Sequence, residues 1–330
     1  MKLLKRILLA LLILIVAGGT ISFFYFKNKF LSAPPNELTV SNLGQAIDFK
    51  WDGATFNDKY NPYGAMLVPV SIPGADRTFF MQFDTGAPNT ILYYKPILSI
   101  NEKYNNLIKI DTIEGNVRAI ETSIKVGTVN VKATSLAFVG MGKKINWSDR
   151  TAVNIIGTVG NDFMENNPII LDFKNNKITL VDSLNQKPEG VKGYLPFTFD
   201  GRKIFLSATL NDEPASLWYD SGSSMFELIV EESTFWELAA PDAKKESFET
   251  HSWGTKVPTH NIKSNGEFDF GSVSIPLTTV TYMEWPNKMQ TFILKAANIG
   301  GDLGGMTGNK LFLGKTLILD TPNLRYTVKE

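Results

Sequence analysis

The chain lacks cysteine altogether and has only two histidines, His251 and His260, among its 330 residues. The absence of cysteine excludes disulfide frameworks, thiolate metal sites and cysteine nucleophiles. The two histidines share one polar stretch with no third ligand beside them, so we expect solvent-exposed or flap residues and no zinc site. The sequence therefore predicts neither a bound metal nor a cofactor.

The chain also lacks an excess of charge of either sign, because 33 lysines and arginines balance 33 aspartates and glutamates. No basic field is present to attract a nucleic acid, and we expect no nucleic-acid partner. The hydrophobic share is 43%, over a length sufficient for two ordinary domains. These values predict a globular protein with substantial cores.

One long apolar run is present near the N-terminus. Residues 7–26 carry no charge and follow Lys2, Lys5 and Arg6. At about 1.5 Å per residue, such a helix covers roughly the 30 Å hydrocarbon core of a bilayer. The preceding cations favour a cytoplasmic start and an extracytoplasmic body, on the periplasmic or cell-surface side. We expect residues 1–35 to form a membrane anchor and tether, with a cleaved signal peptide as the alternative.

Two short acidic motifs each follow an apolar, strand-like segment. Asp84-Thr85-Gly86 follows "RTFFMQF", and Asp220-Ser221-Gly222 follows "SLWY". An aspartate at the end of an apolar strand is costly to bury unless a neighbour compensates its charge. Either motif alone is weak evidence for a site, so the surroundings of both decide the interpretation.

Those surroundings repeat along the chain. Residues 124–139 align with residues 268–283, with a glycine at the same place in each strand–turn–strand pattern. Residues 160–181 align in the same way with residues 308–328. The order of the aligned segments is the same in both halves, which indicates a tandem duplication.

Both halves are expected to be mostly β. Short strand-like segments separated by turn residues dominate, and helical periodicity is limited to brief stretches such as "ESTFWELAA". Residues 182–193 are polar and contain proline and glycine. We place the lobe boundary there, giving an N-terminal lobe over residues 36–187 and a C-terminal lobe over residues 188–330.

Two D-[ST]-G loops in duplicated β halves resemble the aspartic proteases, specifically a single-chain member with two retropepsin-like lobes. The resemblance covers about residues 60–328. It implies two tandem β-barrel lobes of the acid protease fold, a monomer that is an intramolecular pseudo-dimer, and a peptide or protein substrate. It also implies that Ile156 and Gly157 pack beside the first loop. The second lobe departs from this pattern, because Gly304 precedes the aligned Gly305.

The resemblance further implies a flap, which is a hairpin that closes over the substrate. No aromatic residue lies between Leu107 and Ala137, so we expect a glycine-containing flap tip at residues 113–122. Residues 252–257, which include Trp253 and Gly254, occupy the comparable place in the other lobe.

The resemblance implies that Asp84 and Asp220 are the catalytic pair. Two carboxylates within about 3 Å of each other cannot both ionise cheaply, so they share one proton. The ionised member can activate a water while the protonated member hydrogen-bonds the scissile carbonyl. The resulting expectation is a membrane-anchored aspartic endopeptidase.

The neighbouring residues are expected to support this pair. The hydroxyls of Thr85 and Ser221 can bond to the opposite loop, and Gly86 and Gly222 permit a tight turn that brings amide hydrogens to the carboxylates. Ser223 can add a hydroxyl hydrogen bond beside the second aspartate.

Ala87 directly follows the first motif, whereas Ser223 directly follows the second. In pepsin-like relatives a hydroxyl at this position stabilises the ionised carboxylate. Ala87 cannot donate this bond, so we expect activity to extend to a higher pH than in an acid-adapted relative.

Two alternatives remain open from the sequence. A catalytically inactive relative would bind extended peptides or cell-envelope components through the same cleft. A serine hydrolase would use Ser223 or Ser224 with His251, although no nucleophile-elbow glycine pattern accompanies them.

Overall fold

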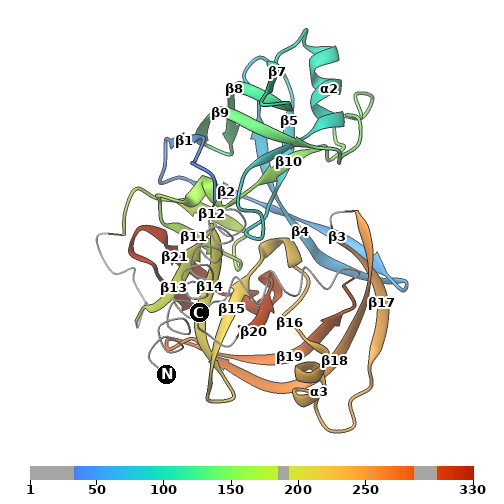
Figure 1. Ribbon diagram of the computed structural model, residues 1–330, viewed down its shortest axis with the longest axis vertical. Coiled ribbons are helices and arrows are strands. Elements are labelled where there is room, and N and C mark those ends of the chain that lie inside the picture. Colours follow the sequence, from blue (N-terminus) through green and yellow to red (C-terminus); the bar gives the residue numbers. More distant parts are fainter. Residues whose placement is uncertain (1–32, 185–192, 253, 286–302) are drawn as a thin grey trace, which may run out of the picture.

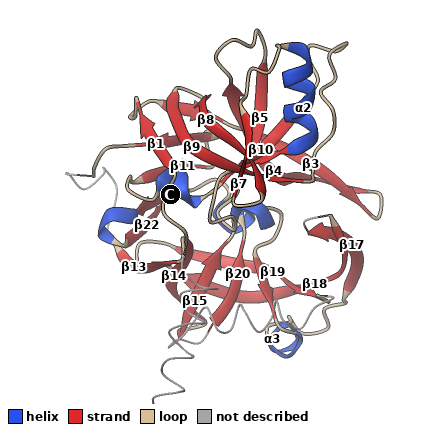
Figure 2. Cartoon of the chain, turned by 45° about the horizontal axis from the view of Figure 1, so that its top comes forward, coloured by secondary structure: helices blue, strands red, loops and turns tan. Residues whose placement is uncertain are grey.

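The computed structural model describes residues 33–184, 193–252, 254–285 and 303–330, and in these ranges the protein is mostly β, as the sequence predicts. Two large sheets dominate, and helices are short and few (Figures 1 and 2). The predicted membrane anchor at residues 7–26 lies outside the described residues. Within the described ranges, no helix has the length and apolar character needed to cross a membrane.

The first half contributes strands β1 to β12. In chain order these are β1 (Leu38–Ser41), β2 (Ala46–Asp48), β3 (Lys50–Phe56), β4 (Lys59–Ser71), β5 (Thr78–Phe83), β6 (Ile91–Tyr93), β7 (Ile110–Ile113), β8 (Asn116–Val126), β9 (Val129–Val139), β10 (Ile155–Val159), β11 (Ile169–Asp172) and β12 (Lys177–Leu180). Helix α2 (Tyr94–Lys103) follows β6, and the 3-10 helix η2 (Asn161–Met164) follows β10.

The second half contributes strands β13 to β22. These are β13 (Leu195–Asp200), β14 (Lys203–Leu210), β15 (Glu213–Tyr219), β16 (Leu228–Val230), β17 (Glu246–Ser252), β18 (Thr255–Asp269), β19 (Ser274–Met283), β20 (Leu303–Thr307), β21 (Thr316–Asp320) and β22 (Arg325–Lys329). The short helices are η3 (Ser221–Ser223), α3 (Glu232–Glu237), η4 (Asn309–Phe312) and η5 (Thr321–Asn323).

Each half closes a ring of paired strands. In the first ring, β4, β5, β10, β6, β9 and β8 pair in that order, and β8 pairs back to β4. In the second ring, β14, β15, β20, β16, β19 and β18 pair in that order, and β18 pairs back to β14. Strand β10 is parallel to β5 and antiparallel to β6, and β20 has the same relation to β15 and β16. The two halves therefore share one strand arrangement.

A joining sheet connects the two rings. Its strands lie in the order β13, β22, β21, β11, β12, β2, so each half supplies three of them. At its centre β11 and β21 are antiparallel, with Ile169 opposite Leu319 and Leu171 opposite Leu317. All four of these side chains are fully buried, which makes the joining sheet part of one continuous core.

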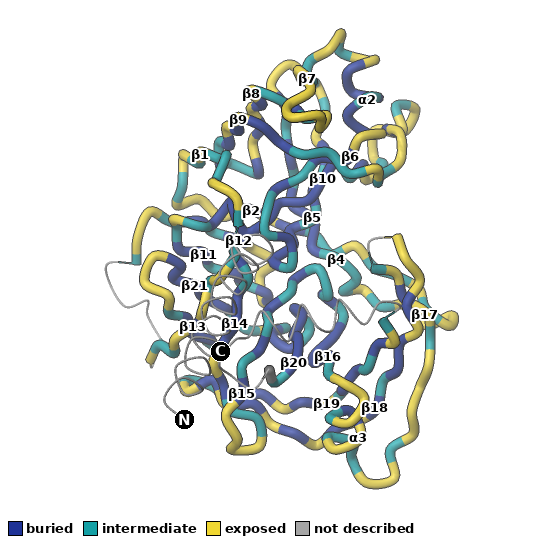
Figure 3. The backbone as a smooth tube through the Cα atoms, viewed as in Figure 1, coloured by how far each residue is buried: buried dark blue, intermediate teal, exposed yellow. Residues whose placement is uncertain are grey.

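The strands that lead to the acidic motifs each bury one face in the core. Phe79, Met81 and Phe83 of β5 alternate inward and are buried, as are Leu217 and Tyr219 of β15. Figure 3 shows buried residues concentrated in β5 and β10 and exposed residues around β7. This alternation is the pattern of a strand with one face on the core.

One helix was absent from the sequence-based expectation. Helix α2 buries Pro96, Ile97 and Ile100 against the first ring. Its apolar pattern spans little more than one turn, which is too short for periodicity to distinguish from a strand or loop.

Candidate active site

The two acidic motifs occupy equivalent places in the two rings. Asp84 follows β5, and its backbone N–H donates to the carbonyl of Val159 at 3.0 Å, at the end of β10. Asp220 follows β15, and its N–H donates to the carbonyl of Thr307 at 2.9 Å, at the end of β20. Each aspartate is therefore fixed where two parallel strands end.

Four hydrogen bonds tie the two loops to each other. The Thr85 hydroxyl donates to the carbonyl of Tyr219 at 3.0 Å and accepts from the N–H of Ser221 at 2.8 Å. The Ser221 hydroxyl donates to the carbonyl of Phe83 at 3.0 Å and accepts from the N–H of Thr85 at 2.9 Å. Both hydroxyls are completely buried. The reciprocal network holds the loops at one fixed separation.

The glycines of the motifs let each loop approach the opposite carboxyl group. A Cβ on Gly86 would lie 2.4 Å from Oδ1 of Asp220, and a Cβ on Gly222 would lie 2.5 Å from Oδ1 of Asp84. No real side chain tolerates such a contact, so only glycine fits at either position. The structure thus brings together the two aspartates that the sequence singled out.

The electrostatics of the pair are asymmetric. Burial raises the pKa of Asp84 well above its ordinary value, and the charge of Asp220 and a side-chain hydrogen bond to Asp220 raise it further. The Gly86 N–H donates to Oδ1 of Asp84 at 2.9 Å. Asp220 accepts at Oδ1 from the Gly222 N–H at 2.8 Å and at Oδ2 from the Ser223 hydroxyl at 2.9 Å. This arrangement favours a proton on Asp84 and a negative charge on Asp220.

The strand glycines behind the loops are also required by close packing. Gly157 lies in β10, where a Cβ would be 2.3 Å from the carbonyl oxygen of Ile91, and the adjacent Ile156 is fully buried. Gly305 lies in β20 with a φ of +123°, and a Cβ there would be 2.7 Å from the carbonyl oxygen of Ile229. The second lobe therefore supports its loop as the first does, although Gly304 departs from the expected sequence pattern.

Two asparagines belong to the site but were not predicted. Asn161 of η2 donates from Nδ2 to the carbonyl of Thr85 at 2.6 Å, and Asn309 of η4 donates to the carbonyl of Ser221 at 3.3 Å. Both are almost completely buried. The signal was present in the sequence, because both follow a glycine at the start of the aligned segments at residues 160 and 308.

A cavity of about 700 Å³, the aspartate cavity, opens onto Asp84 and Asp220. Its polar lining includes Gln82, Thr158 and Lys203. Its large apolar lining residues are Phe56, Met141, Trp218, Met225, Phe226, Met283, Trp285 and Met306. Trp218 therefore faces the cavity, whereas Tyr219 is buried against Phe312. The cavity is large enough for several residues of an extended peptide.

Two hairpins enclose this cavity. Residues 52–56, 64 and 65 of the β3–β4 hairpin line one side, and residues 250–252 and 254 of the β17–β18 hairpin line the other. Figure 1 shows β3 and β4 extending from the first ring toward β17. The expected flap segment 252–257 thus includes two cavity residues, Ser252 and Gly254, while Trp253 lies outside the described residues.

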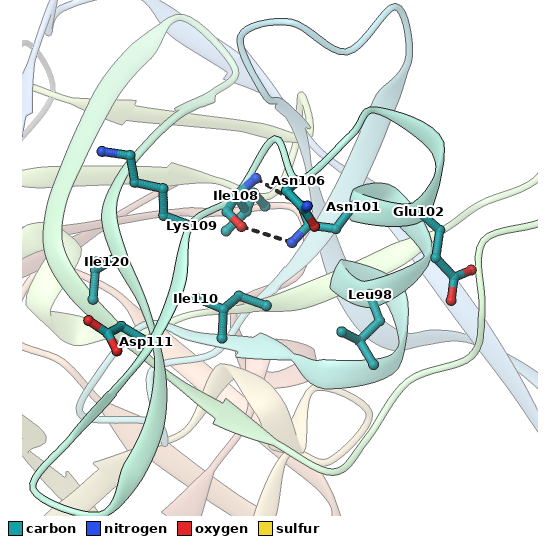
Figure 4. A pocket seen from close by; sticks show the side chains of 9 residues that line it. All are labelled: Leu98, Asn101, Glu102, Asn106, Ile108, Lys109, Ile110, Asp111 and Ile120. Carbon is teal, nitrogen blue, oxygen red and sulfur yellow. Dashed lines mark hydrogen bonds between the residues drawn. The ribbon is translucent and has the colours of Figure 1, made fainter.

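The expected flap tip at residues 113–122 is wrong. None of these residues lines the aspartate cavity. Ile120 instead lines a second cavity of about 540 Å³ beside α2, β7 and β8 (Figure 4). Of the polar side chains drawn there, Asn101 bonds both the N–H and the carbonyl of Ile108 at 2.8 Å. Glycine at the tip suggested a flap, but the strand pairing directs this hairpin to α2.

The tip of the β3–β4 hairpin contacts the first residues of β17, forming a hairpin bridge. The Asn57 side chain donates to the carbonyl of Ser247 at 2.8 Å. Lys59 pairs with Glu246 at 3.2 Å. The rings of Phe56 and Phe248 lie 5.7 Å apart. The aspartate cavity is therefore covered by hairpins from both halves of the protein.

The histidines have different environments. His251 is exposed on β17 and lines the cavity. The expectation of exposure is wrong for His260, which is only 8% exposed and bonds the Ser247 hydroxyl at 2.8 Å and Glu284 at 2.9 Å. Alternation along β18 does not predict this burial, because the adjacent Thr259 is buried as well; the His260 ring instead stacks on Tyr282 with centroids 5.6 Å apart.

In the described part of the chain, neither serine of the second motif has a hydrogen bond to a histidine, although His251 lines the same cavity as Ser223. The Ser223 hydroxyl bonds Asp220, and the Ser224 hydroxyl accepts from Asn309 at 2.9 Å in a fully buried position. Among the described residues, no group of three or more histidine, aspartate or glutamate side chains could hold a metal ion.

No protein-family model matches the chain, and no curated protein matches its sequence.

Proposed function

We propose that the protein is an aspartic endopeptidase with two retropepsin-like lobes. The observation that carries this proposal is the meeting of Asp84 and Asp220 across two loops locked together by Thr85 and Ser221. Turn aspartates with no shared function would not require glycines that exclude any side chain beside the opposite carboxyl. The pair also faces a cavity of suitable size.

The two carboxyl groups have distinct roles in the proposed reaction. Asp220, stabilised as an anion by the Ser223 hydroxyl and the Gly222 N–H, takes a proton from a water bound between the carboxyls. Asp84, whose pKa is raised by burial and by Asp220, donates a hydrogen bond to the scissile carbonyl oxygen. Water attacks the carbonyl carbon as Asp84 passes its proton to the carbonyl oxygen, giving a gem-diol. Asp220 then passes the proton that it took from water to the nitrogen, the C–N bond breaks, and one hydroxyl of the diol returns its proton to Asp84. No covalent intermediate with the protein is formed.

The substrate would lie extended between the hairpins. Extended peptides bind by strand-like backbone hydrogen bonds, with side-chain pockets supplying preference. The large apolar residues of the cavity, such as Trp218, Phe226 and Met306, favour substrate positions with apolar side chains. Phe56 of the hairpin bridge lines the cavity, so the bridge would help to hold an extended chain in place once it is bound.

The cellular setting in this proposal follows from the sequence. The apolar run at residues 7–26 would anchor a monomeric, two-lobed protein to a membrane, with the cavity on the extracytoplasmic side. Peptides or proteins of that compartment would then be the substrates.

The test is cleavage of a generic unfolded protein by the purified chain. Asp84→Asn and Asp220→Asn should each reduce the rate by about 10²–10⁴-fold, because each removes a proton-transferring group. A hydroxyl-containing mimic of the tetrahedral intermediate should inhibit the wild type. A protein that binds unfolded chains but never cleaves them would contradict the proposal and support a catalytically inactive, peptide-binding relative.

A further inference from the structure

One cation lines the aspartate cavity without a partner. Lys203, the first residue of β14, is half-buried and contributes to the same cavity as Asp84 and Asp220. Within the described part of the chain, no acidic side chain forms an ion pair or hydrogen bond with its ammonium group. Long side chains with a free ammonium usually extend into water, so this position is unusual.

The backbone of Lys203 is tied to the loop of Asp84. The preceding Arg202 is 2% exposed and donates to Oδ1 of Asn89 at 2.5 Å and to Oε2 of Glu165 at 2.9 Å. The carbonyl of Arg202 accepts a hydrogen bond from Nδ2 of Asn161 at 2.6 Å. That same amide group donates to the carbonyl of Thr85, next to Asp84. Lys203 therefore keeps a fixed place relative to the catalytic loop.

The position of Lys203 is electrostatically unfavourable in the free protein. Desolvation lowers the pKa of Lys203, and only the charge of the nearby Asp200 opposes this effect. The cavity around it is rich in methionine side chains, and its acidic lining residues, Asp52, Asp84 and Asp220, form no ion pair with Lys203. An anionic group that entered the cavity would supply the missing partner.

We propose that Lys203 forms a subsite that selects a carboxylate of the peptide substrate. This inference rests on the proposed peptidase activity and names a substrate class for it. The carboxylate can belong to an aspartate or glutamate side chain, or to the C-terminus of the substrate. The competing role, donation to a neutral peptide carbonyl, would give no preference for an anionic substrate.

Mapping of cleavage sites tests the subsite. The full chain is incubated with a complex peptide mixture, and products are identified by mass spectrometry. We expect aspartate and glutamate to be enriched at one fixed position relative to the cleaved bond. For peptide pairs that differ by glutamate or glutamine at that position, kcat/KM should differ by at least about tenfold. Peptides with an amidated C-terminus distinguish the two sources of the carboxylate. Amidation removes the C-terminal carboxylate and leaves aspartate and glutamate side chains unchanged.

Variants at Lys203 connect the preference to this residue. Lys203→Met should reduce the ratio of the two kcat/KM values to near one, and Lys203→Arg should retain most of it. The matched control is Lys263→Met, because Lys263 is exposed on β18 and does not line the cavity. The control should keep the wild-type ratio.

Two results would overturn the inference, and they are distinguishable. If the wild type cleaves anionic and neutral peptides at equal rates, the proposed subsite is contradicted but the proposed peptidase activity is still supported. If the wild type cleaves no peptide at all, both the proposed function and the proposed subsite are contradicted. The wild-type measurement decides between these results even if a Lys203 variant fails to fold.

Discussion

Asp84 and Asp220 differ in the hydroxyl groups that surround them. The Ser223 hydroxyl donates to Asp220, whereas the corresponding place beside Asp84 is taken by Ala87, which is buried and has no polar side-chain atom. One carboxyl group is thus stabilised as an anion more strongly than the other. In the proposed mechanism this difference assigns the base to Asp220 and the acid to Asp84.

Replacing Ala87 by serine should shift the pH dependence of activity toward acid. The new hydroxyl can donate to Asp84 and stabilise the ionised pair, which lowers the apparent pKa values of the pair. The measurement is the profile of kcat/KM against pH. Ala239→Ser, in the turn after α3, serves as the control and should leave the profile unchanged. A wild-type profile that peaks only in strong acid and does not move in Ala87→Ser would contradict this account.

Removing the Asp84 carboxyl should change how stability depends on pH. Because the folded-state pKa of Asp84 is raised by burial and by Asp220, the native state binds more protons than the unfolded state between the two pKa values. Wild-type stability should therefore fall as pH rises through that interval. Asp84→Asn removes this contribution and should be relatively more stable than the wild type at neutral pH.

Thermal unfolding at pH 4 and pH 7 measures the effect. The difference in Tm between Asp84→Asn and the wild type should become more positive at the higher pH. Asp111→Asn removes an exposed carboxylate that does not line the aspartate cavity and provides the control. A constant difference in Tm across this range would mean that the pKa of Asp84 is not raised.

At the residue scale, much of the candidate site could be predicted from the sequence. The two repeated tripeptides identified the aspartates, and hydroxyl chemistry indicated the cross-loop bonds of Thr85 and Ser221. Asn161 and Asn309 were missed although both follow a glycine at the start of the aligned segments, because that repeat alone does not show which side chain bonds a loop carbonyl. Lys203 was missed because its unpaired state is visible only when the cavity is known.

At the element scale, the β3–β4 and β17–β18 hairpins enclose the aspartate cavity. The β3–β4 hairpin turns through Asn57 and Asp58, which both have positive φ values of 46° and 60°. Such a two-residue turn matches the twist of the flanking strands and stiffens the hairpin. The tip of the β3–β4 hairpin contacts Ser247 on β17 and covers one side of the aspartate cavity. Sequence reasoning could not choose this hairpin, because several glycine-containing turns are equally compatible with a flap.

Breaking the hairpin bridge should weaken substrate binding. Asn57→Gly keeps the positive φ accessible but removes the side-chain bond to the Ser247 carbonyl. We expect KM to rise several-fold with little change in Tm, and faster amide exchange in β17. Asn105→Gly replaces another asparagine with positive φ, in the turn after α2, and is the control. Unchanged exchange in β17 would show that the bridge does not close the cavity.

At the scale of the whole molecule, the duplication organises the protein. The sequence repeat predicted two similar halves, and the pairing of β10 with β5 and of β20 with β15 follows one pattern. The joining sheet was not predicted, since pairing between β11 and β21 depends on long-range register rather than on local residues. The two loops themselves are joined directly by the hydrogen bonds of Thr85 and Ser221.

Truncating a central residue of the joining sheet should destabilise both halves together. Leu171 is fully buried in β11 opposite Leu317, so Leu171→Ala should cost about 2–5 kcal/mol. Amide exchange should accelerate in both rings and not only in the first. Val117→Ala, at a site that is 46% exposed, should cost much less. Destabilisation confined to one ring would show that the halves are independent units.

The central claim is that Asp84 and Asp220 act as one unit in peptide hydrolysis. The most direct test compares kcat/KM for the wild type, Asp84→Asn, Asp220→Asn and the double variant on one peptide. Groups that act together are strongly non-additive, so the double variant should be about as slow as either single variant. Hydrolysis that survives either substitution, or losses that multiply in the double variant, would contradict the shared-proton mechanism.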